Sequence, residues 1–128
     1  MGDDVACGCR VLGLVHVEAV VRGLTGREER VRLLVDSGVT YTLLPEEVWK
    51  SIRLKSMREH DFILADGTVI KRKVSECYIV LPQGEAHTPV ILGEKDDKAL
   101  LGMVTLEILG LILDPFKRVL KPMKMMLA

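Results

Sequence analysis

Residues 33–40 read LLVDSGVT, and this short stretch decides which folds the chain can adopt. The apolar run of Leu33, Leu34 and Val35 leads directly into Asp36, and Ser37-Gly38 then turns the chain. A carboxylate next to a buried strand loses water, which costs several kcal/mol unless other groups compensate for it. Asp36 is therefore either a turn cap with its charge in solvent, or a carboxylate held where its ionisation is useful. Taken alone, Asp-Ser-Gly favours the turn.

Composition restricts the possible classes of protein. A chain of 128 residues with 48% hydrophobic and 4% aromatic residues predicts a single domain, residues 1–128, with an aliphatic core. Lys plus Arg and Asp plus Glu both number 18, so nucleic acid is not expected as a main partner. The longest apolar stretch, 11–21, is interrupted by His16 and Glu18, and we expect no membrane span.

The cysteines bear on the cellular compartment and on metal binding. Three of them, an odd number, disfavour a secreted disulfide framework, so we expect a reduced, cytoplasmic protein. Cys7, Cys9 and Cys77 leave open a metal–thiolate protein that binds zinc. A second ligand pair at suitable spacing is missing, and the sequence predicts no metal and no cofactor.

The first half of the chain alternates predicted strands and turns. We expect a strand over 11–22, a turn over 24–29 and a return strand over 31–35, whose apolar density predicts burial on both faces. Residues 39–44 are expected to be extended. A short helix follows over 45–52, with Pro45 in its first turn and with Val48, Trp49 and Ile52 on one face. Trp49 is expected in the core.

The second half contains the strongest hairpin signal, Asp66-Gly67 between two β-rich runs. Its second arm can continue to residue 81, and a turn is predicted over 82–85. We then expect a strand over 88–92, a charged loop over 94–98, a helix over 103–109 ended by Gly110, and strands over 111–113 and 119–120. Many short strands with two short helices predict a mostly β fold, a small closed barrel.

Three motifs, in this order and spacing, resemble the retropepsin-like aspartic proteases over residues 31–120. The first is the apolar strand that runs into Asp-Ser-Gly, residues 31–38. The second is a central hairpin, the flap of that family, over 62–78 with its tip at 65–68. The third is Leu100-Leu101-Gly102 before the helix over 103–109, which the resemblance places beneath the catalytic loop.

The resemblance implies an aspartic endopeptidase in which Asp36, Ser37 and Gly38 are catalytic. Hydrolysis by two carboxyls needs one ionised and one protonated, and two carboxyls about 3 Å apart share one proton. Because the chain has one Asp-Ser-Gly, the second Asp36 must come from an identical chain in a two-fold homodimer. We expect the Ser37 hydroxyl to bond to the partner loop, and Gly38 to let the substrate backbone approach.

The expected substrate is a peptide or an unfolded protein held between the catalytic loop and the hairpin tip. The homodimer interface is expected to include the catalytic loops, the hairpin tips and the strands over 111–113 and 119–120. The residues predicted to bind substrate are Gly38, Val39, Thr40, Ala65, Asp66, Gly67 and Thr68.

Two alternatives stay open at this level. Val39 stands where the family usually has Ala, and the hairpin tip contains only Gly67 where viral members have several glycines. These departures fit a catalytically weak or inactive module for peptide binding or dimerisation. A serine nucleophile at Ser37 would need a histidine base, but none sits in a recognisable motif. We expect His16, His60 and His87 at the surface and Cys77 in the core.

Overall fold

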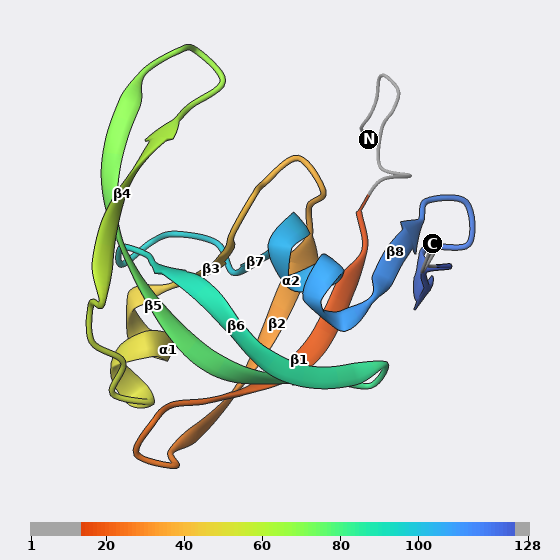
Figure 1. Cartoon of the computed structure of the whole chain (residues 1–128), viewed down its shortest axis with the longest axis horizontal. Helices are drawn as coiled ribbons and strands as arrows, with labels where there is room; N and C mark the ends of the chain where they lie inside the picture. Colours follow the sequence, from red (N-terminus) through yellow and green to blue (C-terminus); the bar gives the residue numbers. More distant parts are fainter. Residues whose placement is uncertain (1–13, 125–128) are drawn as a thin grey trace, which may run out of the picture.

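In the computed structural model of the protein, the structure describes residues 14–124. Its strands and helices follow one another along the chain with short connections (Figure 1). They are β1 His16–Arg22, β2 Glu28–Val35, β3 Thr42–Leu44, α1 Glu46–Ser51, β4 Arg58–Ile63, β5 Val69–Leu81, β6 Gly84–Leu92, β7 Leu100–Leu101, α2 Met103–Leu109, β8 Leu111–Asp114 and β9 Val119–Pro122.

Seven of the strands form one sheet in the order β1-β2-β7-β3-β6-β5-β4, and β8 and β9 form a separate two-stranded sheet. The pairings β2–β7 and β3–β6 are parallel, so they join segments far apart in the chain. Residues 20–22 of β1 also pair with β5, which brings the strand pairings back to the first strand. The predicted mostly β fold with two short helices is confirmed.

The core is aliphatic, as the composition predicts. Leu33, Ile52, Ile79 and Leu101 have fully buried side chains. Burial alternates along β1 and β2, because successive side chains of a strand point to opposite faces. The predicted burial of the return strand on both faces is wrong, since Arg32 is exposed in the middle of β2.

Three strands begin earlier than local composition indicates. β2 starts at Glu28, β4 at Arg58 and β6 at Gly84, because the ladders with their neighbours continue through polar residues. In the β1–β2 hairpin, Arg22 pairs in register with Glu28, and their side chains form an ion pair at 3.3 Å. Cross-strand hydrogen bonding therefore extends strands whose own sequences are charged. β3 is shorter than predicted because residues 39–41 belong to the loop before it.

The two helices lie where the sequence predicts them. Pro45 is the N-terminal cap of α1 rather than a first-turn residue, which suits its missing N–H. Val48 and Ile52 are buried, and the half-buried Trp49 donates its indole N–H to the Gly93 carbonyl at 2.8 Å. Gly110 ends α2 with a left-handed φ of 68°, the conformation that glycine adopts most readily.

The remaining predictions about individual side chains concern cysteine and histidine. Cys77 is 2% exposed, and burial raises the pKa of its thiol to about 12, so it is a protonated core residue. His16, His60 and His87 are exposed, as expected. Cys7 and Cys9 lie outside the described residues. Within residues 14–124, neither helix has the length and apolar character needed to cross a bilayer.

Candidate functional site

The loop that begins with Asp36 is fixed from below by β7. The Asp36 N–H donates to the Leu101 carbonyl at 3.0 Å, and the Leu34 N–H donates to the Ala99 carbonyl at 3.0 Å. Leu101 is fully buried and pairs in parallel with Val35. The predicted packing of Leu100-Leu101-Gly102 beneath the loop is therefore confirmed.

The start of α2 holds the other end of the loop. The Met103 N–H donates to the Val39 carbonyl at 2.8 Å, and the Val104 N–H donates to the Thr40 carbonyl at 2.9 Å. Gly102 makes this contact possible because a Cβ at that position would lie 2.5 Å from the carbonyl carbon of Tyr41. Thus the first amides of the helix, which have no partner within it, are satisfied by the loop.

Three buried threonines add a hydrogen-bond network that the sequence analysis missed. The Thr42 and Thr105 hydroxyls are 2.5 Å apart, and the Thr105 and Thr88 hydroxyls are 2.8 Å apart. Thr42 also accepts a hydrogen bond from the Gly102 N–H at 3.0 Å. All three threonine residues are at most 1% exposed. Their isolated hydroxyls, spread over three elements, gave no local signal, and they meet because β3 pairs in parallel with β6 and α2 packs against both strands.

The Asp36 side chain is oriented by its own turn. It is part of a half-buried residue, and its Oδ1 accepts a hydrogen bond from the Gly38 N–H at 2.9 Å. The Val39 N–H closes the turn on the Asp36 carbonyl at 3.1 Å. Asp36 therefore caps its own turn, as the simpler reading of the sequence predicts. The hydrogen bond from Gly38 fixes the orientation of the carboxylate at the C-terminal end of β2.

A cavity of about 420 Å³ lies between this loop and the β4–β5 hairpin. Of the predicted site residues, Gly38, Val39, Thr40 and Ala65 line it. The remaining lining residues form mostly apolar walls with a charged end, and they are Leu43, Phe62, Ile63, Leu64, Ile70, Arg72, Ile91, Asp97 and Leu100. The site can therefore hold an extended chain with apolar side chains.

The charged end of this cavity is another feature that the sequence analysis did not predict. Arg72 of β5 is paired with Glu94 of the following loop at 3.0 Å, and the Arg72 side chain is 23% exposed. Asp97 accepts a hydrogen bond from the Glu94 N–H at 2.6 Å. The ion pair thus ties the base of the hairpin to the loop over 93–98.

Asp66, Gly67 and Thr68 do not line this cavity but form the exposed tip of the hairpin. The Leu64 N–H donates to the Thr68 carbonyl at 2.7 Å, and Gly67 has a φ of 87°. The Thr68 N–H donates to the Asp66 carboxylate at 2.9 Å. Hydrogen bonds from Thr68 hold the pKa of Asp66 below its usual value, and the side-chain hydrogen bond contributes more than the backbone one. The tip is an ordered turn that projects beyond the cavity.

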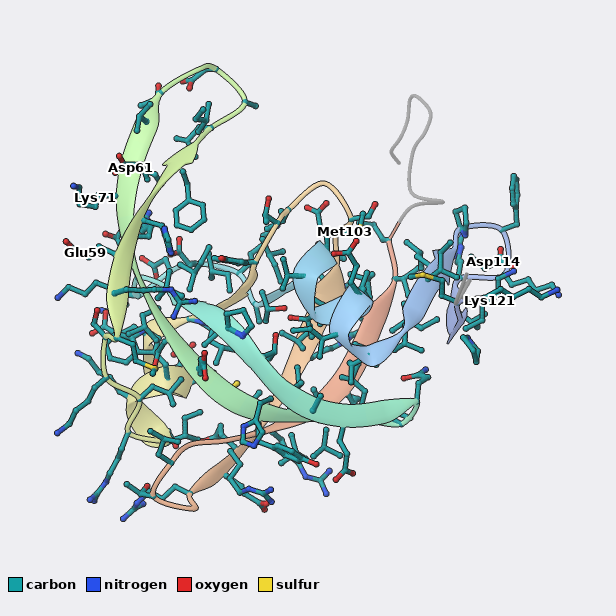
Figure 2. All side chains as sticks on the ribbon, viewed as in Figure 1. Glu59, Asp61, Lys71, Met103, Asp114 and Lys121 are labelled. Carbon is teal, nitrogen blue, oxygen red and sulfur yellow. The ribbon has the colours of Figure 1, made fainter. Side chains whose placement is uncertain are left out.

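The outer side of the hairpin is charged. Figure 2 shows Glu59, Asp61 and Lys71 on the side of the hairpin that faces away from the rest of the molecule. Asp61 and Lys71 form an exposed ion pair at 3.8 Å, a type of contact that contributes little to stability. Glu59, Asp61 and Lys71 therefore mark the solvent face of the hairpin, whereas Phe62 and Ile70 line the cavity.

A second hollow, also of about 420 Å³, lies on the other side of the loop. Ser37 lines it together with apolar residues of α2 and β8, including Met103, Leu106 and Ile112. Figure 2 shows Met103 at the start of α2, close to the loop that contains Asp36. Ser37 is exposed, and it lies at the border between the loop that begins with Asp36 and this mostly apolar hollow.

The comparisons with known proteins agree with this geometry. The sequence model of the aspartyl protease family matches residues 17–105, which is more than half of the chain. This chain therefore belongs to the aspartyl protease family, and it is a retropepsin-like member. No curated protein matches it by sequence.

Two solved structures share the fold. The simian foamy virus (mac) protease, solved in solution, has a TM-score of 0.52 and 19% identity, over 73% of this chain and 93% of that chain. The EIAV protease complexed with the inhibitor HBY-793 has a TM-score of 0.58 and 13% identity, over 80% of this chain and 94% of that chain. At these identities the likeness shows the fold alone.

Proposed function

We propose that this chain is an aspartic endopeptidase that acts as a homodimer and hydrolyses peptide bonds with the Asp36 residues of its two copies. The observation that carries the proposal is the position of Asp36. It directly follows β2, in which Val31, Leu33 and Val35 are buried, its backbone is bound to β7, and Gly38 and Val39 of the same loop line the cavity below the hairpin.

The chemistry follows from a pair of carboxyls with one proton between them. One carboxylate takes a proton from water as the water oxygen attacks the carbonyl carbon, while the other carboxyl donates its proton to the carbonyl oxygen. The C–N bond then breaks, the leaving amine takes up the proton that came from water, and the second carboxyl regains its proton as the new acid forms. The two groups must be held close together and shielded from bulk water for the proton to be shared. Asp36 Oδ1 is already fixed by Gly38, which limits the rotation of the side chain.

The exposed apolar residues around Ser37 support the homodimer. Met103 of α2 and Ile112 of β8, which line the same hollow as Ser37, are 40% and 45% exposed. A surface of this kind next to the catalytic loop fits an interface between two copies. In this arrangement Ser37 contacts the partner loop, and the pairing of β1 with both β2 and β5 supports a small closed barrel in each copy.

A peptide-binding module without efficient turnover is the second candidate. Two observations favour it: Val39 occupies space in the cavity, and hydrogen bonds close the hairpin tip at Leu64, Gly67 and Thr68. In that case the dimer binds an unfolded chain in the same cavity and releases it intact.

The first experiment separates the two candidates. Purified wild type and Asp36→Asn are incubated with an unfolded protein and a peptide library from acid to neutral pH, with and without pepstatin. We expect cleavage with an acid optimum and sensitivity to pepstatin, and a loss of at least about 100-fold in Asp36→Asn with an intact fold. Asp61→Asn is the matched control, because it makes the same chemical change on the solvent face of the hairpin. Binding of the unfolded protein by wild type without any cleavage would support the module instead.

The second experiment tests the shared dyad. Wild-type and Asp36→Asn chains are unfolded together at several ratios and refolded, and the cleavage rate is measured. If each site needs two copies of Asp36, the rate falls as the square of the wild-type fraction, because mixed dimers are inactive. A linear dependence means that each chain works alone and contradicts the dimeric dyad.

A further inference from the structure

Three rings join the base of the hairpin to the segment that follows the catalytic loop. The Tyr41 ring centre lies 5.9 Å from that of Phe62 and 6.2 Å from that of His60. The rings of His60 and Phe62, two residues apart on β4, are 6.4 Å apart. All three pairs meet edge to face, with interplanar angles between 67° and 76°, which is a favourable geometry for rings.

The two sides of this cluster differ in how firmly they are held. The backbone of Tyr41 is packed against Gly102, and the neighbouring Thr40 carbonyl accepts a hydrogen bond from α2. β4 lies at the edge of the sheet and, within the described residues, pairs with β5 alone. Figure 1 shows the β4–β5 hairpin projecting from the body of the molecule. The cluster thus connects a fixed segment to a projecting one.

We propose that Tyr41 is a positioning residue, whose ring sets how the hairpin stands over the cavity and thereby how tightly an unfolded chain binds there. Tyr41 acts through Phe62, because Phe62 lines the cavity and contacts the Tyr41 ring. The inference rests on the proposed function in one respect, namely that the chain binds between the loop and the hairpin.

The aromatic ring, rather than the phenol hydroxyl, carries this role. The contacts of Tyr41 with His60 and Phe62 are ring contacts, so Tyr41→Phe should behave like the wild type. Tyr41→Ala should free the hairpin. Tyr78→Ala is the matched control, since Tyr78 makes the same kind of edge-to-face contact with His87 at 4.9 Å, on strands β5 and β6 outside the cavity.

The first readout uses the protein without a ligand. Amide hydrogen exchange over residues 59–64 should become about 10-fold faster in Tyr41→Ala and stay at the wild-type rate in Tyr41→Phe and Tyr78→Ala. If Tyr41→Ala does not fold, His60→Ala removes the exposed ring of the cluster and should accelerate hydrogen exchange of the same amides to a smaller extent. Wild-type exchange in the folded variant overturns the proposal.

The second readout is the binding of fluorescein-labelled β-casein, an unfolded protein, to the Asp36→Asn protein. Adding Tyr41→Ala should weaken binding about 10-fold, and Tyr41→Phe should restore it. In the active enzyme, the same change should appear in KM and leave kcat nearly unchanged, which loss of folded protein would not produce. If Asp36→Asn alone binds no casein, the proposed function fails, while hydrogen exchange still decides the role of Tyr41. Equal binding with and without the Tyr41 ring overturns the inference.

Discussion

The loop that begins with Asp36 and the β4–β5 hairpin face the same cavity but are built in opposite ways. The loop over 36–40 is bound to β7 through Asp36 and to α2 through Val39 and Thr40. One strand of the hairpin, β4, lies at the edge of the sheet, and the exposed tip is held by the hydrogen bonds of its own turn. Glycine has a different role in each region: Gly102, at the start of α2, is packed against the backbone of Tyr41 and Thr42 next to the loop, whereas a Cβ at Gly67 in the hairpin tip would meet nothing within 4 Å.

This difference fits the tasks that the two regions have in the proposed reaction. A carboxylate that transfers protons must stay in one orientation, because even a small displacement lowers the rate. A cover over the cavity must let a chain enter and leave, so it belongs to the less stable parts of a fold. Four predictions test whether the loop is as fixed, and the hairpin as free, as the structure indicates.

The largest effect is expected from Gly102→Ala. The new Cβ would lie 2.5 Å from the carbonyl carbon of Tyr41 and 2.8 Å from the Thr42 nitrogen, so the backbone must move. We expect a loss of about 3 kcal/mol in the free energy of unfolding and a fall in kcat of about 100-fold. Urea unfolding and steady-state kinetics measure both. Near-wild-type values would show that the loop tolerates displacement.

Thr105→Val tests the buried hydroxyl network that supports the loop. Valine has nearly the same shape but leaves the hydroxyls of Thr42 and Thr88 without their common partner. We expect a loss of about 1 to 3 kcal/mol in the free energy of unfolding, because buried polar groups lose a hydrogen bond. Thr25→Val, in an exposed turn, is the control and should stay within about 0.5 kcal/mol of the wild type. Equal free energies of unfolding for the two variants would show that the threonine network does not stabilise the fold.

Gly67→Ala probes the hairpin tip. Gly67 has a φ of 87°, where an alanine costs about 1 kcal/mol, but its side chain would meet no atom within 4 Å. We expect a KM about 5-fold higher with kcat nearly unchanged, since a cost of this size changes a binding equilibrium by about that factor. Gly26→Ala is the control, because Gly26 has a φ of 88° in the β1–β2 turn. If both variants change KM equally, the tip has no special role.

The smallest effect concerns Asp66 and acid. Because the Thr68 hydrogen bonds lower the pKa of Asp66, the folded carboxyl binds its proton more weakly than the unfolded one. The stabilisation of the turn by the ionised Asp66 carboxylate is therefore complete above the ordinary pKa of 3.8, and it is lost as the pH falls through the lowered pKa. Titration of the Asp66 carboxyl carbon by NMR should give a midpoint below 3.8, lower than in a peptide of residues 62–70. A midpoint above that of the peptide would contradict the assignment.

The fold was predictable from the sequence wherever the signal was local. Asp66-Gly67 located the hairpin, Gly110 ended α2, and the apolar run before Asp36 located a buried strand. Strand boundaries were less predictable, as at Arg58, because charged residues are drawn into a strand by the hydrogen bonds of a neighbour. Residue spacing also matched the aspartyl protease family, which the family comparison then confirmed.

The features of the candidate site also fall into those that the local sequence predicts and those that it does not. The sequence by itself determined that Asp36 follows a strand with a buried apolar face, that Gly38 turns the chain after it and that Leu101 returns to the core, because burial and turn formation depend on residues next to one another. Only the tertiary structure decided that the Asp36 N–H is bound to Leu101 and that the ring of Tyr41 meets that of Phe62. It also placed Thr42 and Thr105 within hydrogen-bonding distance. These contacts join residues up to 65 positions apart, and which distant partner satisfies a buried amide or hydroxyl depends on how the whole sheet pairs.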